Sequence, residues 1–368
     1  MRRGPNGSMS MATLAFLVLG GLIVLSLVLY VYLKFEVLAR NLIYLRHMVH
    51  PSIVSKLRTP RHFFHSNIVA RNTEAITNDR VKIYGWHLMP AGRESIDIVS
   101  PLSALDESHS DGIFDKSLLD AKRVVVFFHG IAGCRGGVWL CGSARVSLVR
   151  SLATHFGSHV VAFDYRGFGD CQGLPSEAGI LEDALAAWTW VSMRVDPSKC
   201  KVALYGQSMG SAVAAKLAAE LCERQQSSSS VRPSAVILDA PFTCLADAAC
   251  HHPISRGVLG LLAALGGAPL RDAALRRLPD AWPTVAHVST IARAKCPVLI
   301  LANSADEVVP VQLSQKVYEA AAAATATATT GVHFSEITAP KVLTRHHVDT
   351  FTAYDWIAKV GKFLDDYA

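Results

Sequence analysis

The hydrophobic pattern of this chain changes character near residue 34. Residues 12–33 read ATLAFLVLGGLIVLSLVLYVYL, without a charged side chain, and basic residues flank the run on both sides. About 20 apolar residues suffice for a helix that crosses a bilayer core. The run is too long for the apolar region of a signal peptide, and no pair of small residues marks a cleavage site at its end. It predicts an uncleaved transmembrane signal anchor after a short tail, residues 1–11.

Residues 34–68 form a second, amphipathic segment. Basic residues alternate here with Leu, Ile, Val and Met, as in FEVLARNLIYLRHMVHPSIVSKLR over residues 35–58. The pattern predicts a juxtamembrane helix that packs on the domain after it. A helix lying in the membrane surface is the alternative, because such helices combine the same residue types. No later run reaches about 18 uncharged apolar residues, so a single span is expected.

Residues 69–368 alternate between strand and helix patterns. Lys and Tyr alternate with apolar residues over Val81–Leu88, which predicts an antiparallel edge strand. Short apolar runs typical of strands buried on both faces follow at Val124–Phe128, His159–Phe163, Val202–Tyr205, Ala235–Leu238, Val298–Leu301 and Val332–Ile337. Helical patterns separate several of them, at Val146–Phe156, Leu181–Val191 and Ser211–Cys222. This order predicts an α/β domain with a mostly parallel central sheet and helices on both faces.

One connection in this domain is unusually long. About 50 residues, 244–293, separate two predicted strands and hold an apolar part, GVLGLLAALGGAPL, followed by a basic part, RDAALRRLP. Long connections in compact domains are usually functional. We therefore expect a cap inserted into the α/β domain.

Composition narrows the class of protein. The chain has 368 residues, is 51% hydrophobic and 18% charged, and carries a formal net charge of +6. These values exclude disorder and give no reason to expect a nucleic-acid partner. Eight cysteines are too few for a disulfide scaffold. Cys134 with Cys141, or Cys244 with Cys250, could pair in an oxidising lumen, but buried free thiols are the simpler expectation. No phosphate loop, dinucleotide fingerprint or metal-ligand spacing occurs, so neither a cofactor nor a metal is expected.

The chemistry centres on one serine. The predicted strand Val202–Tyr205 leads into Gly206-Gln207-Ser208-Met209-Gly210, and a helical pattern follows. A strand before and a helix after are the setting in which a G-x-S-x-G motif exposes a nucleophile. Gly206 and Gly210 are needed because side chains would clash in so tight a turn. Ser208 is the predicted nucleophile.

A serine nucleophile needs a base and an orienting carboxylate, which follow it in the order Asp, then His in this kind of fold. Asp306 stands in the turn after the strand pattern VLILANS, and its neighbour Glu307 is the fallback. The base is one of the adjacent residues His346 and His347, which precede the last helical pattern.

The oxyanion requires two preorganised N–H donors. The backbone amide of Met209 follows the nucleophile, and the amide of Ile131 follows the first buried strand in Phe128-His129-Gly130-Ile131. These two amides are the predicted oxyanion hole. His129 is expected to hydrogen-bond within its own loop rather than act as a second base.

Several of these motifs together resemble a known family. HGIAGCRGG (129–137), VVAFDYRGFGDCQGLPSEAGILEDA (160–184), YGQSMG (205–210) and DEVVP (306–310) are similar to the abhydrolase-domain group of α/β-hydrolases. Within it, the chain resembles the membrane-anchored lipases of lysophosphatidylserine and monoacylglycerol. The resemblance favours His347 over His346, because the Val-Asp-Thr after His347 resembles the His-Asn-Asp-Thr loop of related hydrolases.

The resemblance implies a membrane-anchored serine hydrolase that cleaves acyl esters of lipids through an acyl-enzyme. It also implies a single-pass, type II protein of the endoplasmic reticulum with a lumenal catalytic domain. The basic residues do not decide this orientation, because they are equally numerous on the two sides of the apolar run. The group includes thioesterases that depalmitoylate proteins and serine peptidases, which are the alternatives. A non-enzymatic membrane scaffold is disfavoured because Ser, Asp and His all stand in order. Head group, acyl length and oligomeric state stay open.

Overall fold

A computed structural model describes most of residues 69–368 and pieces of the N-terminal part. The described residues are 19–27, 30, 40, 44–45, 51–64, 68–90, 107–137, 144–224, 232–325, 331–338, 347 and 350–368. Most of the predicted anchor and juxtamembrane segment lies outside them, as does His346. Within the anchor, residues 19–27 are helical, and the side chains of Leu22, Ile23 and Leu25 among others are exposed.

The domain is built on an eight-stranded sheet in the order β1-β2-β4-β3-β5-β6-β7-β8. Strands β3 to β8 run parallel, whereas β2 pairs antiparallel with β1 and β4. The strands are β1 Ala70–Ile76, β2 Lys82–Leu88, β3 Arg123–Phe128, β4 His159–Phe163, β5 Lys201–Gln207, β6 Pro233–Asp239, β7 Val298–Asn303 and β8 Val332–Ile337. The predicted mostly parallel α/β sheet is confirmed.

The predicted edge strand is not at the edge. Strand β2 does run antiparallel, but β1 pairs along its whole length and forms the border of the sheet. Only Thr73 and Ala75 of β1 are buried. A strand that buries so few side chains leaves a weak hydrophobic pattern, which is why the sequence did not predict it.

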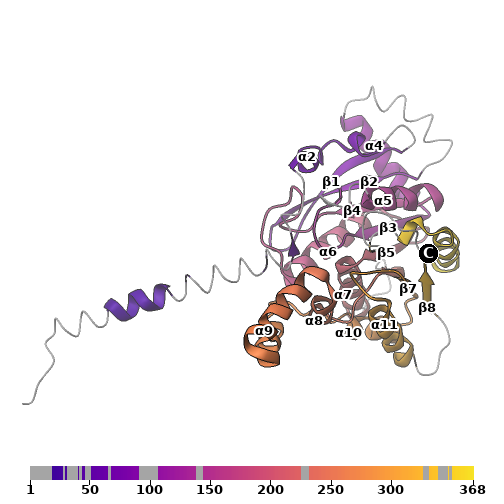
Figure 1. The fold of residues 1–368 in the computed structure, drawn as a ribbon. Coiled ribbons are helices and arrows are strands. Elements are labelled where there is room, and N and C mark those ends of the chain that lie inside the picture. The colour runs from indigo at the N-terminus through magenta and orange to yellow at the C-terminus, as the bar shows by residue number, and fades with distance from the viewer. Residues whose placement is uncertain are drawn as a thin grey trace, which may run out of the picture.

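Helices cover both faces of the sheet (Figure 1). Along β3, Val124 and Val126 face one apolar cluster and Val125 and Phe127 face the other, as the alternation of side chains in a strand requires. The first cluster includes α6 Glu177–Ser192, α7 Met209–Glu223, α10 Thr284–Arg293 and α11 Val311–Ala324. The second includes α5 Ala144–His155 and α12 Trp356–Tyr367. The shorter elements are α2 Pro51–Val54, η1 Pro60–His62, α4 Glu107–Leu119 and η2 Thr350–Thr352.

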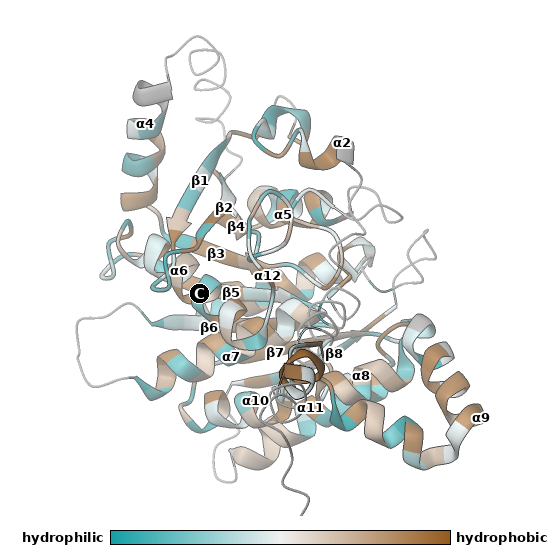
Figure 2. Cartoon of the chain, turned by 90° about the vertical axis from the view of Figure 1, so that its left-hand side faces the viewer, coloured by the Kyte–Doolittle hydropathy of each residue, from teal (hydrophilic) through white to brown (hydrophobic). Residues whose placement is uncertain are grey.

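The long connection between β6 and β7 folds into three helices. α9 Pro253–Arg276 stands out from the body (Figures 1 and 2). α8 Leu245–His251 lies at its base with Leu245 buried, and α10 buries Val288 and Ile291 among the helices over the sheet. α9 is broken at Gly266 and Gly267, where φ is −142° and +69°. A φ of +69° is readily adopted only by glycine, so this residue pair sets the bend between two arms.

One helix in the described part of the chain is long and apolar enough to span a bilayer. It is Ser255–Arg276, inside α9, with a mean hydropathy of 1.4 and none of its apolar window buried. This helix lies mid-chain, and Arg256 and Arg271 interrupt the uncharged run that the sequence argument required. The bend at Gly266 also prevents the two arms from forming one straight span.

Candidate active site

Ser208 occupies a strained turn between β5 and α7. Its φ of +55° and ψ of −120° are unusual for a residue with a side chain. A Cβ atom on Gly206 would lie 2.1 Å from the carbonyl oxygen of Gly210, and one on Gly210 would lie 2.0 Å from that of Phe128. Both positions therefore require glycine, for the reason that the motif suggested.

The three predicted side chains lie in hydrogen-bond contact. His347 Nε2 is 2.8 Å from Ser208 Oγ, and His347 Nδ1 is 2.8 Å from Asp306 Oδ2. The other oxygen of Asp306 accepts from the backbone amides of Val308 at 2.7 Å and Val309 at 2.9 Å. These bonds fix the carboxylate, and Glu307 beside it is exposed to solvent.

Burial and the neighbouring Asp306 carboxylate shift the pKa of His347 in opposite directions. Burial alone would lower its pKa, but the charge of Asp306 and the hydrogen bond to it outweigh burial, and the pKa is raised. A base whose pKa is raised holds a proton more readily once it has taken it from a hydroxyl. The Asp306 carboxylate also orients the imidazole with Nε2 toward Ser208, since it occupies Nδ1.

A second carboxyl group, Asp239 at the end of β6, lies beside this arrangement and was not predicted. Its two oxygens accept from Tyr205 Oη at 2.9 Å and from Thr350 Oγ1 at 2.8 Å. Complete burial is the main reason that its pKa is raised to about 6, and the nearby charge of Asp306 adds to the effect. The available signal was its position at the carboxyl end of the strand next to β5.

The two predicted oxyanion residues flank Ser208. Met209 and Ile131 line the same cavity as Ser208. Met209 is the first residue of α7, where backbone N–H groups have no partner within the helix. A Cβ atom on Gly130 would lie 3.1 Å from the Cβ of Ser208, so the loop before Ile131 runs directly against Ser208.

Arg145 of α5 holds this loop, which the sequence did not suggest. Its buried guanidinium donates to the carbonyls of residues 130, 131, 132 and 134, at distances from 2.7 to 3.1 Å. One side chain thus fixes the backbone of residues 130–134, which we call the oxyanion loop. Arg145 stands just before the predicted helical pattern Val146–Phe156, so the sequence pattern gave no signal of this role.

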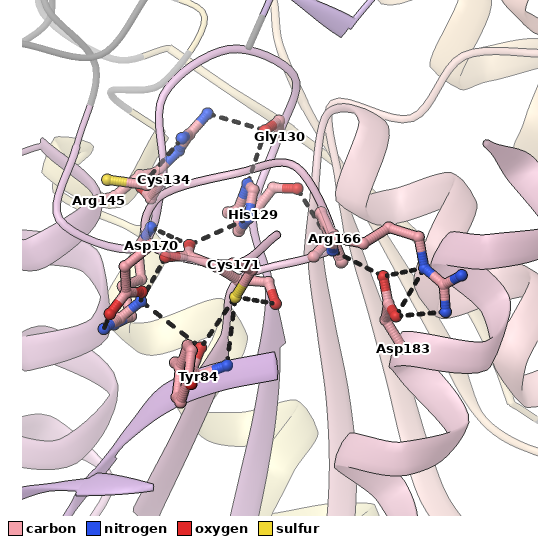
Figure 3. A network of polar contacts seen from close by, with 12 residues as sticks. Tyr84, His129, Gly130, Cys134, Arg145, Arg166, Asp170, Cys171 and Asp183 are labelled. Atoms are coloured by element: carbon pink, nitrogen blue, oxygen red, sulfur yellow. Dashed lines mark hydrogen bonds and ion pairs between the residues drawn. The ribbon is translucent and has the colours of Figure 1, made fainter. Parts of the chain in front are cut away.

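A polar network supports the loop from below (Figure 3). His129 Nδ1 lies 2.9 Å from the carbonyl oxygen of Gly130, and its Nε2 lies 3.3 Å from Asp164 Oδ1, so this histidine bonds within its own loop as expected. The Asp164 carboxylate, which is buried, also pairs with Arg135 Nη1 at 2.5 Å. Arg135 in turn binds Asp170 at 2.7 Å.

An apolar cavity of 370 Å³ opens at Ser208. Its walls come from the oxyanion loop, from the turn after β7, and from both arms of α9, which contribute Val258, Leu259 and Leu262 on one arm and Ala274 and Leu275 on the other. No Lys, Arg, Asp or Glu occurs among the described residues that line it. The cavity is suited to a hydrocarbon group held next to a nucleophile.

Thiols do not contribute to this site. The described cysteines, including Cys134, Cys244 and Cys250, are all free, so the possible Cys244–Cys250 pair is not formed. Cys141 lies outside the described residues. Burial raises the pKa of Cys134 to about 12, which keeps this thiol protonated and unreactive.

Comparison with known proteins agrees with the fold and the motifs. Residues 120–270 match the family described as serine aminopeptidase, S33. Lysophosphatidylserine lipase ABHD12 of Danio rerio is 36% identical over 251 residues, which are 66% of this chain and 56% of that protein. The Macaca fascicularis ABHD12 is 36% identical over 214 residues, 57% of this chain and 48% of that one. The chain thus spans about half the length of the curated relatives it matches.

Solved structures show the same fold at low sequence identity. The esterase Pf2001 of Pyrococcus furiosus aligns with a TM-score of 0.55 at 19% identity, covering 84% of this chain and 93% of that one. An α/β-hydrolase of Vibrio vulnificus aligns with a TM-score of 0.56 at 16% identity, covering 90% and 92%.

Sheet order, the turn at Ser208 and the solved structures together define the class: this chain has the α/β-hydrolase fold, and the family match over residues 120–270 supports a serine hydrolase. Within that class it is similar to the lysophosphatidylserine lipases of vertebrates named ABHD12.

Proposed function

We propose that this protein is a serine hydrolase that cleaves the acyl ester of a lipid with one acyl chain, such as a lysophospholipid or a monoacylglycerol. The observation that carries the proposal is the apolar cavity, which opens at the Ser208 hydroxyl and is lined by the cap helix α9. Such a cavity holds the hydrocarbon chain of a substrate and leaves its ester carbonyl at the nucleophile.

The residues have separate roles in the proposed reaction. Ser208 Oγ attacks the ester carbonyl, and His347 Nε2 takes the hydroxyl proton while Asp306 holds the imidazole in place. The amides of Met209 and Ile131 stabilise the oxyanion. His347 then gives the proton to the leaving alcohol, and the acyl group stays on Ser208. Water, deprotonated by the same base, releases the fatty acid and restores the serine.

The head group lies outside the cavity in this proposal. A phosphate or a serine carboxylate needs cationic or hydrogen-bonding partners, and the described lining contains no Lys or Arg, with His252 and Ser255 as its polar side chains besides Ser208. The name of the similar lysophosphatidylserine lipases favours that head group, but the cavity itself recognises the acyl chain.

A bilayer is the proposed source of the substrate. Helix α9 exposes Leu261, Leu265 and Leu270, and it carries hydrophobic stretches that are brown in Figure 2. Large exposed apolar surfaces mark membrane or protein contacts. With residues 12–33 as an anchor, the protein would be single-pass and type II, with its domain in the lumen of the endoplasmic reticulum. Protease added to sealed microsomes should then spare the domain until detergent is added.

A serine peptidase is the second candidate, because the matched family is described as serine aminopeptidase. An aminopeptidase must bind the charged amino terminus of its substrate, and carboxylates usually do so. The described lining of the cavity offers none. A protein depalmitoylase would use the same acyl cavity and the same residues.

A substrate panel on the purified full-length chain tests the proposal. The panel contains lysophosphatidylserine, two other lysophospholipids, monoacylglycerol, a palmitoyl thioester and an aminoacyl amide, with Ser208→Ala as the blank. We expect fatty-acid release from single-chain lipids and a loss of about 10⁴-fold in Ser208→Ala. Hydrolysis of the amide alone would favour the peptidase, and activity that survives in Ser208→Ala would contradict the assignment of the nucleophile.

A further inference from the structure

Two residues from the segment that joins the apolar N-terminal helix to the domain are built into the active site. Tyr44 is only 1% exposed, and its ring packs edge-on against Phe168, with ring centres 6.3 Å apart. The next residue, Leu45, lines the cavity that holds Ser208. Its φ of +47° is unusual for leucine and turns the chain at this point.

The base of the cap holds Tyr44 in place. Its hydroxyl donates to Asp280 Oδ2 at 2.7 Å and accepts from Trp282 Nε1 at 3.1 Å. Arg40 Nη1 donates to the same carboxylate oxygen at 2.9 Å. The other oxygen of Asp280 accepts from the Glu177 amide at the start of α6, at 3.0 Å. We call the group of Arg40, Tyr44, Asp280 and Trp282 the Tyr44 latch.

The Tyr44 hydroxyl is buried and stays protonated. Burial first, and then the charge of Asp280, raise the pKa of Tyr44 well above its ordinary value, so the hydroxyl remains a donor at every physiological pH. Buried hydrogen bonds to a charged group are among the stronger ones in proteins.

Tyr44 also binds the oxyanion loop directly. Its carbonyl oxygen accepts a hydrogen bond of 3.2 Å from the amide of Ala132, the residue after Ile131. On the other side of the loop, the Arg145 guanidinium holds the carbonyls of Ile131 and Ala132. The loop is therefore held from one side by a helix of the domain and from the other by the N-terminal segment.

From these contacts we infer that Tyr44 is a positioning residue for the oxyanion hole and that Leu45 is a specificity-determining wall of the acyl cavity. The segment after the apolar N-terminal helix is then part of the catalytic domain. Tyr44 connects Asp280 and Trp282, between α9 and α10, to the loop beside Ser208. The inference rests on the proposed function, since it concerns the same hydrolytic site.

The test uses purified full-length protein with p-nitrophenyl butyrate and p-nitrophenyl dodecanoate as short and long esters. Tyr44→Phe removes the latch hydroxyl but keeps the ring and the backbone carbonyl. Complete loss of one oxyanion donor lowers kcat by about 10²-fold or more. Tyr44→Phe should only displace the donor, so we expect kcat to fall by roughly tenfold for both esters. KM should change little, and the melting temperature should stay far above the assay temperature.

Two further variants complete the test. Leu45→Ala should lower kcat/KM for the dodecanoate relative to the butyrate several-fold, because the longer acyl chain depends more on the apolar wall to which Leu45 contributes. Tyr354→Phe is the matched control, since this tyrosine is fully exposed and should keep wild-type kinetics. If Tyr44→Phe does not fold, Arg40→Gln replaces it in the test. This variant removes the ion pair between Arg40 and Asp280, the residue that also binds Tyr44, and it should likewise lower kcat.

The outcomes separate the two proposals. If the wild type hydrolyses neither ester, the proposed function fails and the inference falls with it. If the wild type is active and Tyr44→Phe keeps its kcat, only the inference is overturned, and a drop in melting temperature without a drop in kcat has the same meaning. An equal effect of Leu45→Ala on both esters would remove Leu45 as a chain-length determinant.

Discussion

The carbonyl oxygen of Gly130 accepts a hydrogen bond of 3.1 Å from the buried guanidinium of Arg145. A trans peptide group is planar, with its carbonyl and N–H pointing in opposite directions. Binding the Gly130 carbonyl therefore also orients the N–H of the next residue, Ile131, which is the proposed oxyanion donor. Arg145, which lies on α5 and does not line the cavity, thus orients the proposed oxyanion donor.

This relationship predicts a large kinetic effect of Arg145→Lys. A lysine ammonium cannot reach several carbonyls from one rigid plane, so the oxyanion loop loses its geometry. We expect kcat to fall by about 10²-fold, comparable to the loss of an oxyanion donor. Steady-state kinetics and a melting curve measure the effect. The control is Arg150→Lys, an exposed arginine on the same helix that should behave as wild type. Wild-type kcat in Arg145→Lys would show that the loop keeps its shape without the guanidinium.

The base is tested by comparing two adjacent histidines. His347→Ala should lower kcat by about 10³-fold or more, because the imidazole within 2.8 Å of Ser208 Oγ is lost. His346→Ala should cost much less. The rate of labelling by a fluorophosphonate probe provides a second readout that needs no substrate. A larger loss of kcat in His346→Ala than in His347→Ala would show that His346 is the base.

The pH profile should report the pKa of His347. Nucleophilic attack needs the neutral imidazole, so kcat/KM rises as pH rises through this pKa. Because the pKa is raised, the acidic limb should lie above pH 6.5, the ordinary value. In Asp306→Asn the remaining influence of burial lowers the pKa, and the limb should move to lower pH while kcat falls by about 10⁴-fold. A limb that stays in place in Asp306→Asn would contradict the pairing of these two residues.

The exposed leucines of α9 should matter only for substrate in a membrane. Leu261 and Leu265 are 60% and 73% exposed and do not line the cavity. Replacing both by Ser should lower activity on lysolipid in vesicles several-fold, because burial of a leucine side chain in the bilayer favours contact with the membrane. Hydrolysis of soluble p-nitrophenyl butyrate should be unchanged. Met193→Ser, an exposed apolar residue just after α6, is the matched control. Equal losses on both substrates would indicate a folding defect instead of membrane contact.

The sequence alone was sufficient for the features that depend on neighbours along the chain. Strands β2 to β8 left apolar runs, and the turn at Ser208 required glycine at two fixed positions, so both could be read from local pattern. The positions of Ser208 and Asp306 followed from the same strand-by-strand reading, whereas His347 was favoured over His346 only by the resemblance to related hydrolases. In the structure Ser208, Asp306 and His347 lie in contact.

Tertiary structure decided what depends on residues far apart. Tyr44 and Asp280 are separated by 236 positions, and Asp239 gains its partner Thr350 across 111. Neither pairing can be predicted from local periodicity. A single buried hydrogen bond constrains the two residues that form it and leaves the sequence between them free to vary. Strand β1, with two buried side chains, was missed for the related reason that its stability comes from pairing with β2. Local patterns record which faces of an element are buried, whereas the support of the oxyanion loop arises only once the sheet has brought distant segments together.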